Sequence, residues 1–138
     1  MRFQLLAIAA CAALAPLAPA SAAPESIAGR WKTDDGRALV EFGRCGEAIC
    51  GRIVRLLAPE PPGGARDAEN PKAALRSRKI DGLRIFWNLE PDGAKWSGEG
   101  YSPEDGRYFN AEVSRSGNRL RIKGCVMLFC RTVTWTPA

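Results

Sequence analysis

The chain has 138 residues, a formal net charge of +5 and no histidine. This length fits one domain with a modest hydrophobic core. The lack of histidine excludes Ser-His-Asp and Cys-His catalysis, general acid–base catalysis by histidine, and metal sites that need a histidine ligand. The sequence contains no positive catalytic signature, and we therefore expect a protein that is not an enzyme and that needs no cofactor.

The N-terminus has the pattern of a secretory signal peptide. A Met-Arg start is followed by an apolar segment, 5–15, which is too short to span a bilayer, and by the small-x-small cleavage signal Ala20-Ser21-Ala22. The residues that lead up to Cys11 also fit a lipobox in composition, but the cleavage signal downstream is better. We therefore expect a signal peptide of residues 1–22 and a mature domain of residues 23–138 that is periplasmic or secreted and does not span the membrane.

The mature part carries a moderate net charge of +4, spread along the sequence. One basic cluster lies in residues 76–79. Another lies in residues 119–123, where basic and apolar residues alternate as on the solvated face of a strand. Export and a spread charge argue against a nucleic-acid partner, so we expect none. Weak attraction to anionic envelope components is the functional alternative to a merely solvated face.

Eight short segments of the mature chain predict β-strands and an all-β fold. Glycine and proline make up 22 of its 116 residues and separate these segments, as is typical of a β-rich protein. Because short turns join most of the strands, we expect an antiparallel meander. Eight strands with one solvated and one apolar face can close into a small barrel and so remove their edges. The expected strands are 29–33, 38–44, 49–56, 83–90, 96–101, 107–114, 119–124 and 131–136.

A long polar loop follows the third strand. Residues 58–70 carry three prolines and two adjacent glycines, and Asn70 followed by Pro71 is typical of the start of a helix. The sequence therefore predicts one short helix over 72–78. Loops of this length are often lids over a site, so the loop is either a functional lid or a salt-bridged plug at one end of the barrel.

Two arginines of the predicted helix are candidate ligand-binding residues. Arg76 and Arg78 are two positions apart, so they point to different sides of a helix. We expect one of them to pair with Asp67 or Asp81, and the other to meet solvent or an anionic ligand.

Four cysteines remain in the mature chain, in two C-x4-C pairs. They allow three pairings, and the local one, Cys45–Cys50 with Cys125–Cys130, is feasible because the first pair flanks a four-residue hairpin loop. Sequence alone leaves the connectivity open. A tetrahedral zinc site built from all four cysteines is the alternative. In an exported protein we favour disulfides and expect no metal.

Several short segments occur together in one order. They include Gly29-Arg30-Trp31, Cys50-Gly51-Arg52-Ile53-Val54, Asn70-Pro71, Leu75-Arg76-Ser77-Arg78, Gly100-Tyr101-Ser102-Pro103-Glu104-Asp105-Gly106-Arg107-Tyr108 and Cys130-Arg131-Thr132. Over nearly the whole mature chain, this combination resembles the bacterial secreted family called domain of unknown function 2147. One departure is Pro137, which stands where a basic residue is expected. The resemblance implies a small calycin-like barrel exported from Gram-negative cells, and no established activity, cofactor or catalytic residue.

The Gly29-Arg30-Trp31 segment also resembles the Gly-x-Trp motif with which lipocalin barrels open. In those barrels the tryptophan closes the floor, and a basic residue from the last strand packs across it. By this resemblance we expect Trp31 to be a core residue and Arg131 to stack on it through a cation–π interaction.

Aromatic residues supply the remaining candidate ligand-binding side chains. Phe86, Trp87 and Trp96 lie on neighbouring strands, and they indicate either a cavity for an apolar ligand or a filled core. Tyr101 and Tyr108 flank an acidic turn. This turn either binds a polar ligand or a sugar, or it is a charged hairpin tip with the tyrosines packed at its base.

The favoured function is that of an exported, monomeric and non-catalytic β-barrel that binds a small apolar or amphipathic ligand. The alternative is a structural or interaction protein of the cell envelope with a filled barrel, whose long loop contacts a partner. A second alternative is a glycan-acting enzyme that pairs the carboxylate of Glu99 with that of Glu104 or Asp105.

Overall fold

The computed structural model describes residues 11–18 and 22–138. Residues 11–18 form neither helix nor strand and are exposed to solvent. The start of the predicted signal peptide and its cleavage site lie outside the described residues. Within the described ranges, no helix is long and apolar enough to cross a membrane.

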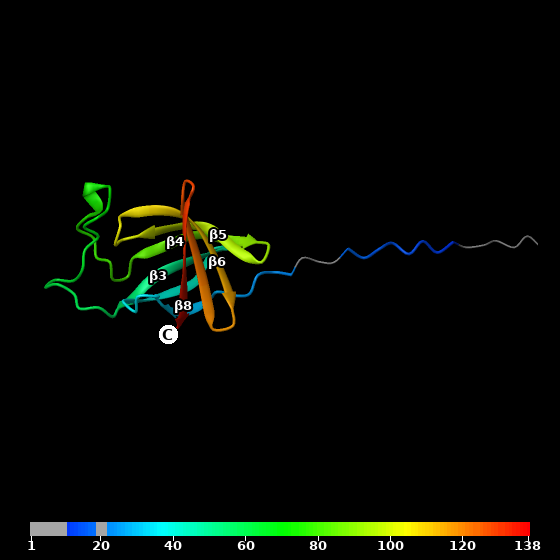
Figure 1. The fold of residues 1–138 in the computed structure, drawn as a ribbon, viewed down its shortest axis with the longest axis horizontal. Coiled ribbons are helices and arrows are strands. Elements are labelled where there is room, and N and C mark those ends of the chain that lie inside the picture. Colours follow the sequence, from blue (N-terminus) through cyan, green and yellow to red (C-terminus); the bar gives the residue numbers. More distant parts are fainter. Residues whose placement is uncertain (1–10, 19–21) are drawn as a thin grey trace, which may run out of the picture.

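Eight antiparallel strands form a closed barrel, in which each strand pairs with the next and β8 pairs with β1 (Figure 1). The predicted all-β fold and eight-stranded antiparallel barrel are therefore confirmed. Each predicted segment corresponds to one strand, because turns or loops interrupt the chain between segments of alternating polarity, and all of these connections except the one between β7 and β8 contain glycine. The strands are β1 (Gly29–Lys32), β2 (Ala38–Cys45), β3 (Ala48–Leu56), β4 (Arg84–Asp92), β5 (Lys95–Ser102), β6 (Arg107–Ser116), β7 (Arg119–Val126) and β8 (Phe129–Pro137).

The predicted short helix in the β3–β4 loop is a single turn. Residues Ala73–Leu75 form a 3-10 helix, η1, in place of the expected helix over 72–78. The chain leaves helical geometry because the carbonyl of Arg78 accepts a hydrogen bond of 3.0 Å from the backbone N–H of Asp67. Tertiary hydrogen bonds thus override the local preference for a longer helix.

The cysteines of the barrel form two local disulfides, Cys45–Cys50 and Cys125–Cys130. They cross-link the β2–β3 hairpin and the β7–β8 hairpin close to their turns. The preference for disulfides is confirmed, and the structure selects the local connectivity among the three pairings. The alternative of a zinc site built from these four cysteines is not the arrangement that the structure shows.

One end of the barrel is closed around Trp31, which is 2% exposed. Its indole Nε1 donates a hydrogen bond of 3.1 Å to the carbonyl of Ile27. The guanidinium of Arg115 lies over the indole, 5.1 Å from the ring centroid. The prediction that Arg131 stacks on Trp31 is therefore wrong. Arg115 lies near the end of β6 that reaches Trp31, whereas Arg131 pairs with Gly124 and borders the opposite end of the barrel.

Aromatic rings fill the middle of the barrel. Phe86 packs against Phe42, Phe109 and Trp135 with ring centroids 5.1 to 6.0 Å apart. The ring of Phe109 also lies against Gly100, where an added Cβ would clash with it. The absence of a side chain at Gly100 therefore makes room for Phe109 inside the barrel.

We predict that Gly100→Ala lowers the free energy of unfolding by about 1–3 kcal/mol, because the ring of Phe109 must shift. Gly43→Ala is the matched control, since Gly43 is also a strand glycine and an added Cβ meets no atom within 4 Å. The control is expected to lose no stability. Urea unfolding followed by tryptophan fluorescence measures both variants, and equal losses would contradict the role given to Gly100.

Candidate functional site

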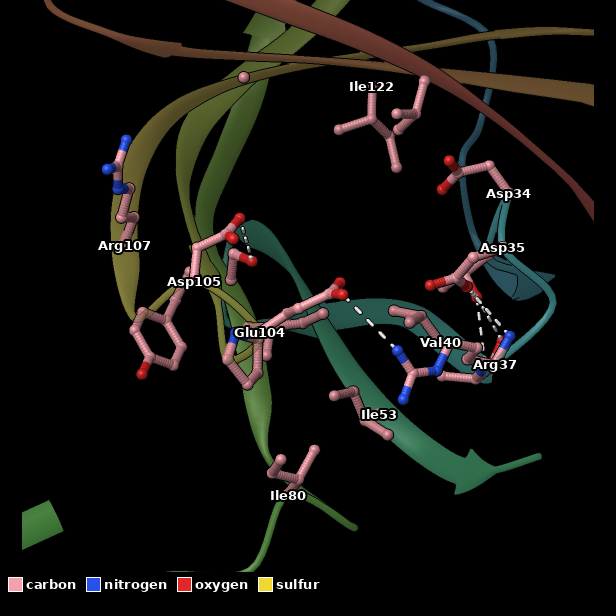
Figure 2. Close-up of a pocket in the computed structure, with 18 of the residues that line it drawn as sticks. Asp34, Asp35, Arg37, Val40, Ile53, Ile80, Glu104, Asp105, Arg107 and Ile122 are labelled. Carbon is pink, nitrogen blue, oxygen red and sulfur yellow. Dashed lines mark hydrogen bonds and ion pairs between the residues drawn. The ribbon is translucent and has the colours of Figure 1, made fainter. Parts of the chain in front are cut away.

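A cavity of about 760 Å³ opens at the barrel end opposite Trp31, where the β1–β2, β3–β4, β5–β6 and β7–β8 connections border it. Its inner wall is apolar, and Figure 2 shows three of the side chains that form it, Val40, Ile53 and Ile122. Pockets for small molecules span roughly 300–1,000 Å³, so the cavity is large enough for a ligand. The apolar lining residues include Val40, Ile53, Ile80, Ile85, Phe86, Phe109, Ile122, Val133 and Trp135.

The mouth of this cavity carries acidic side chains that have partners within the protein (Figure 2). Asp34 accepts a hydrogen bond of 3.2 Å from the indole N–H of a β8 tryptophan. Glu104 forms an ion pair of 3.5 Å with Arg37, which links the β1–β2 and β5–β6 turns. Partial burial raises the pKa of Asp35, but hydrogen bonds from Thr33 and from the backbone N–H of Arg37 outweigh burial and leave that pKa lowered.

Two arginines at the mouth have no such ion-pair partner. Arg107 lies two positions before Phe109 on β6, and Arg131 lies two positions before Val133 on β8, so both belong to the strand faces that line the cavity. Within residues 22–138, neither guanidinium forms an ion pair. Both groups are therefore available to a negatively charged part of a ligand. Sequence reasoning missed Arg107, although its alternation with Phe109 indicates an inward position.

The long β3–β4 loop is anchored to the barrel by the buried carboxylate of Asp67. This carboxylate accepts hydrogen bonds from the hydroxyl of Tyr101 at 2.5 Å, from Nδ2 of Asn70 at 2.8 Å and from Nε of Arg78 at 2.8 Å. Arg78 is thus the arginine that pairs with Asp67. Arg76 instead donates from Nε to the carbonyl of Asn70 at 2.8 Å.

Burial and hydrogen bonding shift the pKa values of this network in opposite directions. Burial raises the pKa of Asp67, but the hydrogen bonds from Tyr101, Asn70 and Arg78 outweigh burial and hold that pKa below its ordinary value. The pKa of Tyr101 is raised to about 12. Burial of the phenol is the larger cause, and the hydrogen bond that it donates to the Asp67 carboxylate is the next. At neutral pH the carboxylate is therefore charged and the phenol is a donor, which is what the anchor requires.

The candidate aromatic residues mostly lie away from the cavity. Phe86 and Tyr101 border it, whereas Trp87, Trp96 and Tyr108 do not. Trp87 and Tyr101 pack against Tyr108, with ring centroids 6.3 and 4.6 Å from it. Trp96 donates from Nε1 to a carbonyl of the segment before β1 at 3.0 Å. The expectation that Trp87 and Trp96 line a cavity is corrected, because Phe86 occupies the inward position on β4 and Trp96 lies near the closed end.

The carboxylates considered for glycan hydrolysis are divided between the cavity mouth and the barrel surface. Glu104 and Asp105 border the cavity, whereas Glu99 does not and is exposed on β5. In the part of the chain that the structure describes, no group of three or more His, Cys, Asp or Glu side chains is placed to hold a metal ion.

Comparisons with known proteins agree with this fold. The model of a family described as "Uncharacterized protein conserved in bacteria (DUF2147)" matches residues 29–137. Among solved structures, protein HP1028 from the human pathogen Helicobacter pylori, which belongs to the lipocalin family, is similar with a TM-score of 0.72. It is 20% identical, and the match covers 82% of this chain and 83% of that chain. At this identity the likeness shows a lipocalin-like fold. A comparison with curated protein sequences finds no match.

We predict that Asp67→Ala lowers the free energy of unfolding by about 3 kcal/mol at neutral pH, because it leaves the partly buried guanidinium of Arg78 without its partner. Since the native pKa of Asp67 lies below its unfolded value of about 3.9, the stabilisation is fully present above that value. It is lost as the pH falls through the lower native pKa.

Urea unfolding of wild type and variant, repeated from neutral to strongly acidic pH, measures this dependence. The stability difference between the two proteins should shrink as the pH falls. Asp81→Ala is the control, because Asp81 is an exposed residue of the same loop and its removal is expected to change stability by less than about 0.5 kcal/mol. A difference that stays constant with pH would contradict the role of the Asp67 charge.

Proposed function

Because this chain belongs to the bacterial family DUF2147 and folds as a lipocalin-like barrel, we propose that it is a non-catalytic protein that binds a small amphipathic ligand. The observation that carries the proposal is the cavity of about 760 Å³, with its apolar wall and charged mouth. An apolar chain or ring system in this cavity would displace water from side chains such as Ile53, Phe109 and Ile122. The same cavity makes a filled barrel the weaker alternative.

The polar end of the ligand would lie at the mouth of the cavity. The carboxylate of Asp34 already accepts an internal hydrogen bond and that of Glu104 an ion pair, whereas Arg107 and Arg131 have no ion-pair partner within residues 22–138. Guanidinium groups bind carboxylates and phosphates through paired N–H donors. We therefore favour a ligand with a carboxylate or phosphate at one end and an apolar body, of which a fatty acid is the simplest example.

The two disulfides indicate an exported protein. We extend this to the removal of residues 1–22 and to a monomer of residues 23–138 in the periplasm or outside the cell. The intact mass of protein recovered from the periplasm of an expression host should equal that of residues 23–138, less the hydrogen atoms lost from two cysteine pairs. A chain that retains residues 1–22 would contradict the proposal.

We predict that the double substitution Arg107→Gln with Arg131→Gln weakens binding of dodecanoate about tenfold, because its carboxylate loses charge-assisted hydrogen bonds. Binding of dodecanol, which has the same apolar chain without the charge, should change by less than about twofold. Displacement of a fluorescent fatty-acid analogue measures both affinities.

Arg119→Gln is the matched control for this experiment, because Arg119 is an exposed arginine on β7 that does not border the cavity. It should leave both affinities unchanged. The proposed function fails if the wild-type protein binds neither compound. The role of the two arginines fails if the double variant loses dodecanoate and dodecanol equally.

A further inference from the structure

The turn between β7 and β8 exposes a continuous apolar segment. Met127, Leu128 and Phe129 are 91%, 95% and 84% exposed, and Val126 before them is 39% exposed. Among the other large hydrophobic side chains of residues 22–138, none is more than 46% exposed. Figure 1 shows that this hairpin, drawn in red at its tip, projects beyond the neighbouring strands. Clustered apolar side chains on a protein surface mark a contact with a partner or a membrane.

This hairpin tip, residues 126–129, lacks the residue types that tight turns ordinarily use. Val126 pairs with Phe129, so Met127 and Leu128 form a two-residue turn, and Met127 has a φ of 56°. Glycine, asparagine and aspartate are the usual residues in this left-handed conformation. The β2–β3, β4–β5 and β6–β7 turns follow that rule with Gly46, Gly93 and Gly117. Apolar residues at this turn adopt an unfavourable backbone conformation and lower solubility. Their presence there indicates that they contact another surface.

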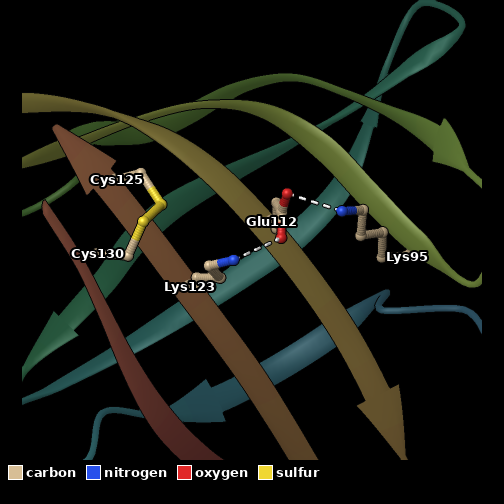
Figure 3. The surroundings of a disulfide bond; sticks show 5 residues. All are labelled: Lys95, Glu112, Lys123, Cys125 and Cys130. Carbon is tan, nitrogen blue, oxygen red and sulfur yellow. Dashed lines mark hydrogen bonds and ion pairs between the residues drawn. A yellow bond between two sulfur atoms is a disulfide. The ribbon is translucent and has the colours of Figure 1, made fainter. Parts of the chain in front are cut away.

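A disulfide lies directly below the hairpin tip. Cys125 and Cys130 are opposite each other on β7 and β8, and their bond closes the base of the turn (Figure 3). This cross-link restricts the conformations of the tip before any partner binds. Docking therefore orders little additional chain, which favours association.

The charge of the hairpin complements an anionic surface. Residues 117–138 contain four basic residues and no acidic residue. The carboxylate of Glu112 on β6 forms two ion pairs, one of 3.8 Å with Nζ of Lys123 and one of 2.7 Å with Nζ of Lys95 on β5 (Figure 3). Arg131, two positions after Phe129, forms no ion pair within residues 22–138 and is the unpaired base nearest the tip. Arg119 and Arg121 lie beside the β6–β7 turn, at the other end of the hairpin.

The size of the tip favours a lipid surface over a protein. Stable protein interfaces bury roughly 20–30 residues on each side, whereas this apolar segment comprises four residues, Val126 to Phe129. Insertion into the interfacial layer of a bilayer has no such requirement, because its strength follows the apolar area inserted and the attraction to anionic lipids.

We propose that the β7–β8 hairpin tip is a membrane-docking site that inserts Met127, Leu128 and Phe129 into an anionic lipid bilayer. Val126 and Phe129 also border the mouth of the cavity. Docking therefore brings the β7–β8 side of the mouth, which carries Arg131, close to the lipid surface. The docking itself does not depend on the ligand, so either proposal can fail while the other holds.

The test is co-sedimentation of the exported protein with vesicles. One set contains equal parts of phosphatidylglycerol and phosphatidylcholine, and the other contains phosphatidylcholine alone. We expect binding to the anionic vesicles and much weaker binding to the neutral ones. Met127→Ser with Leu128→Ser should lower the affinity for anionic vesicles at least about tenfold, since burial of two large apolar side chains is lost. Both side chains are more than 90% exposed, at 91% and 95%, so the substitutions leave the core intact.

Leu57→Ser is the control, because Leu57 is 40% exposed in a different connection. It should bind vesicles as the wild type does. Displacement of the fluorescent fatty-acid analogue should be unchanged in the double serine variant, since neither Met127 nor Leu128 borders the cavity. Absence of vesicle binding, or equal binding by wild type and the double variant, would overturn the proposal. So would a concentration-dependent dimer that the serine substitutions abolish in a protein that binds no vesicles.

Discussion

The pairing of β1 with β8 closes the sheet, and both ends of the molecule depend on this closure. The contact is short, because it consists of the pairs Trp31↔Pro137 and Lys32↔Thr136. It nevertheless removes the two sheet edges and directs one face of every strand inward. An eight-stranded barrel is just wide enough to be filled by side chains or to hold one small ligand. In this protein the two outcomes occur at different ends of the same barrel.

The difference between the ends comes from the segments that cover them. At the closed end, Trp31, Trp96 and Arg115 each donate a hydrogen bond to a carbonyl of the segment before β1, which holds that segment against the barrel. At the other end, Asp67 binds the hydroxyl of Tyr101 and anchors the β3–β4 loop. That loop contributes to the border of the cavity without filling it. The same chain thus builds a fixed floor and leaves an accessible apolar space.

Much of this fold follows from local patterns in the sequence. Alternating polarity and turn residues predict the eight strands, and the C-x4-C spacing makes the local disulfides feasible. Of the helix predicted over 72–78, only Ala73–Leu75 is helical. Residues after it form hydrogen bonds with other parts of the loop, which no local pattern in the sequence reveals.

The candidate site was harder to predict, because it depends on three-dimensional register. Phe86 and Trp87 are adjacent on β4. Which of the two side chains points into the barrel depends on an irregularity in the pairing of β4 with β5, which follows Trp87. Arg131 and Arg115 are both basic strand residues, and only the barrel geometry decides which of them reaches Trp31. The inward position of Arg131, by contrast, is readable from its alternation with Val133.

A crystal structure of the protein grown with dodecanoate tests the central claim most directly. We predict that the acyl chain lies in the cavity, in contact with Ile53, Phe109 and Ile122, and that the carboxylate lies at the mouth beside Arg107 and Arg131. An acyl chain bound only on the outer surface of the barrel would contradict the claim, and so would a cavity closed by its own side chains.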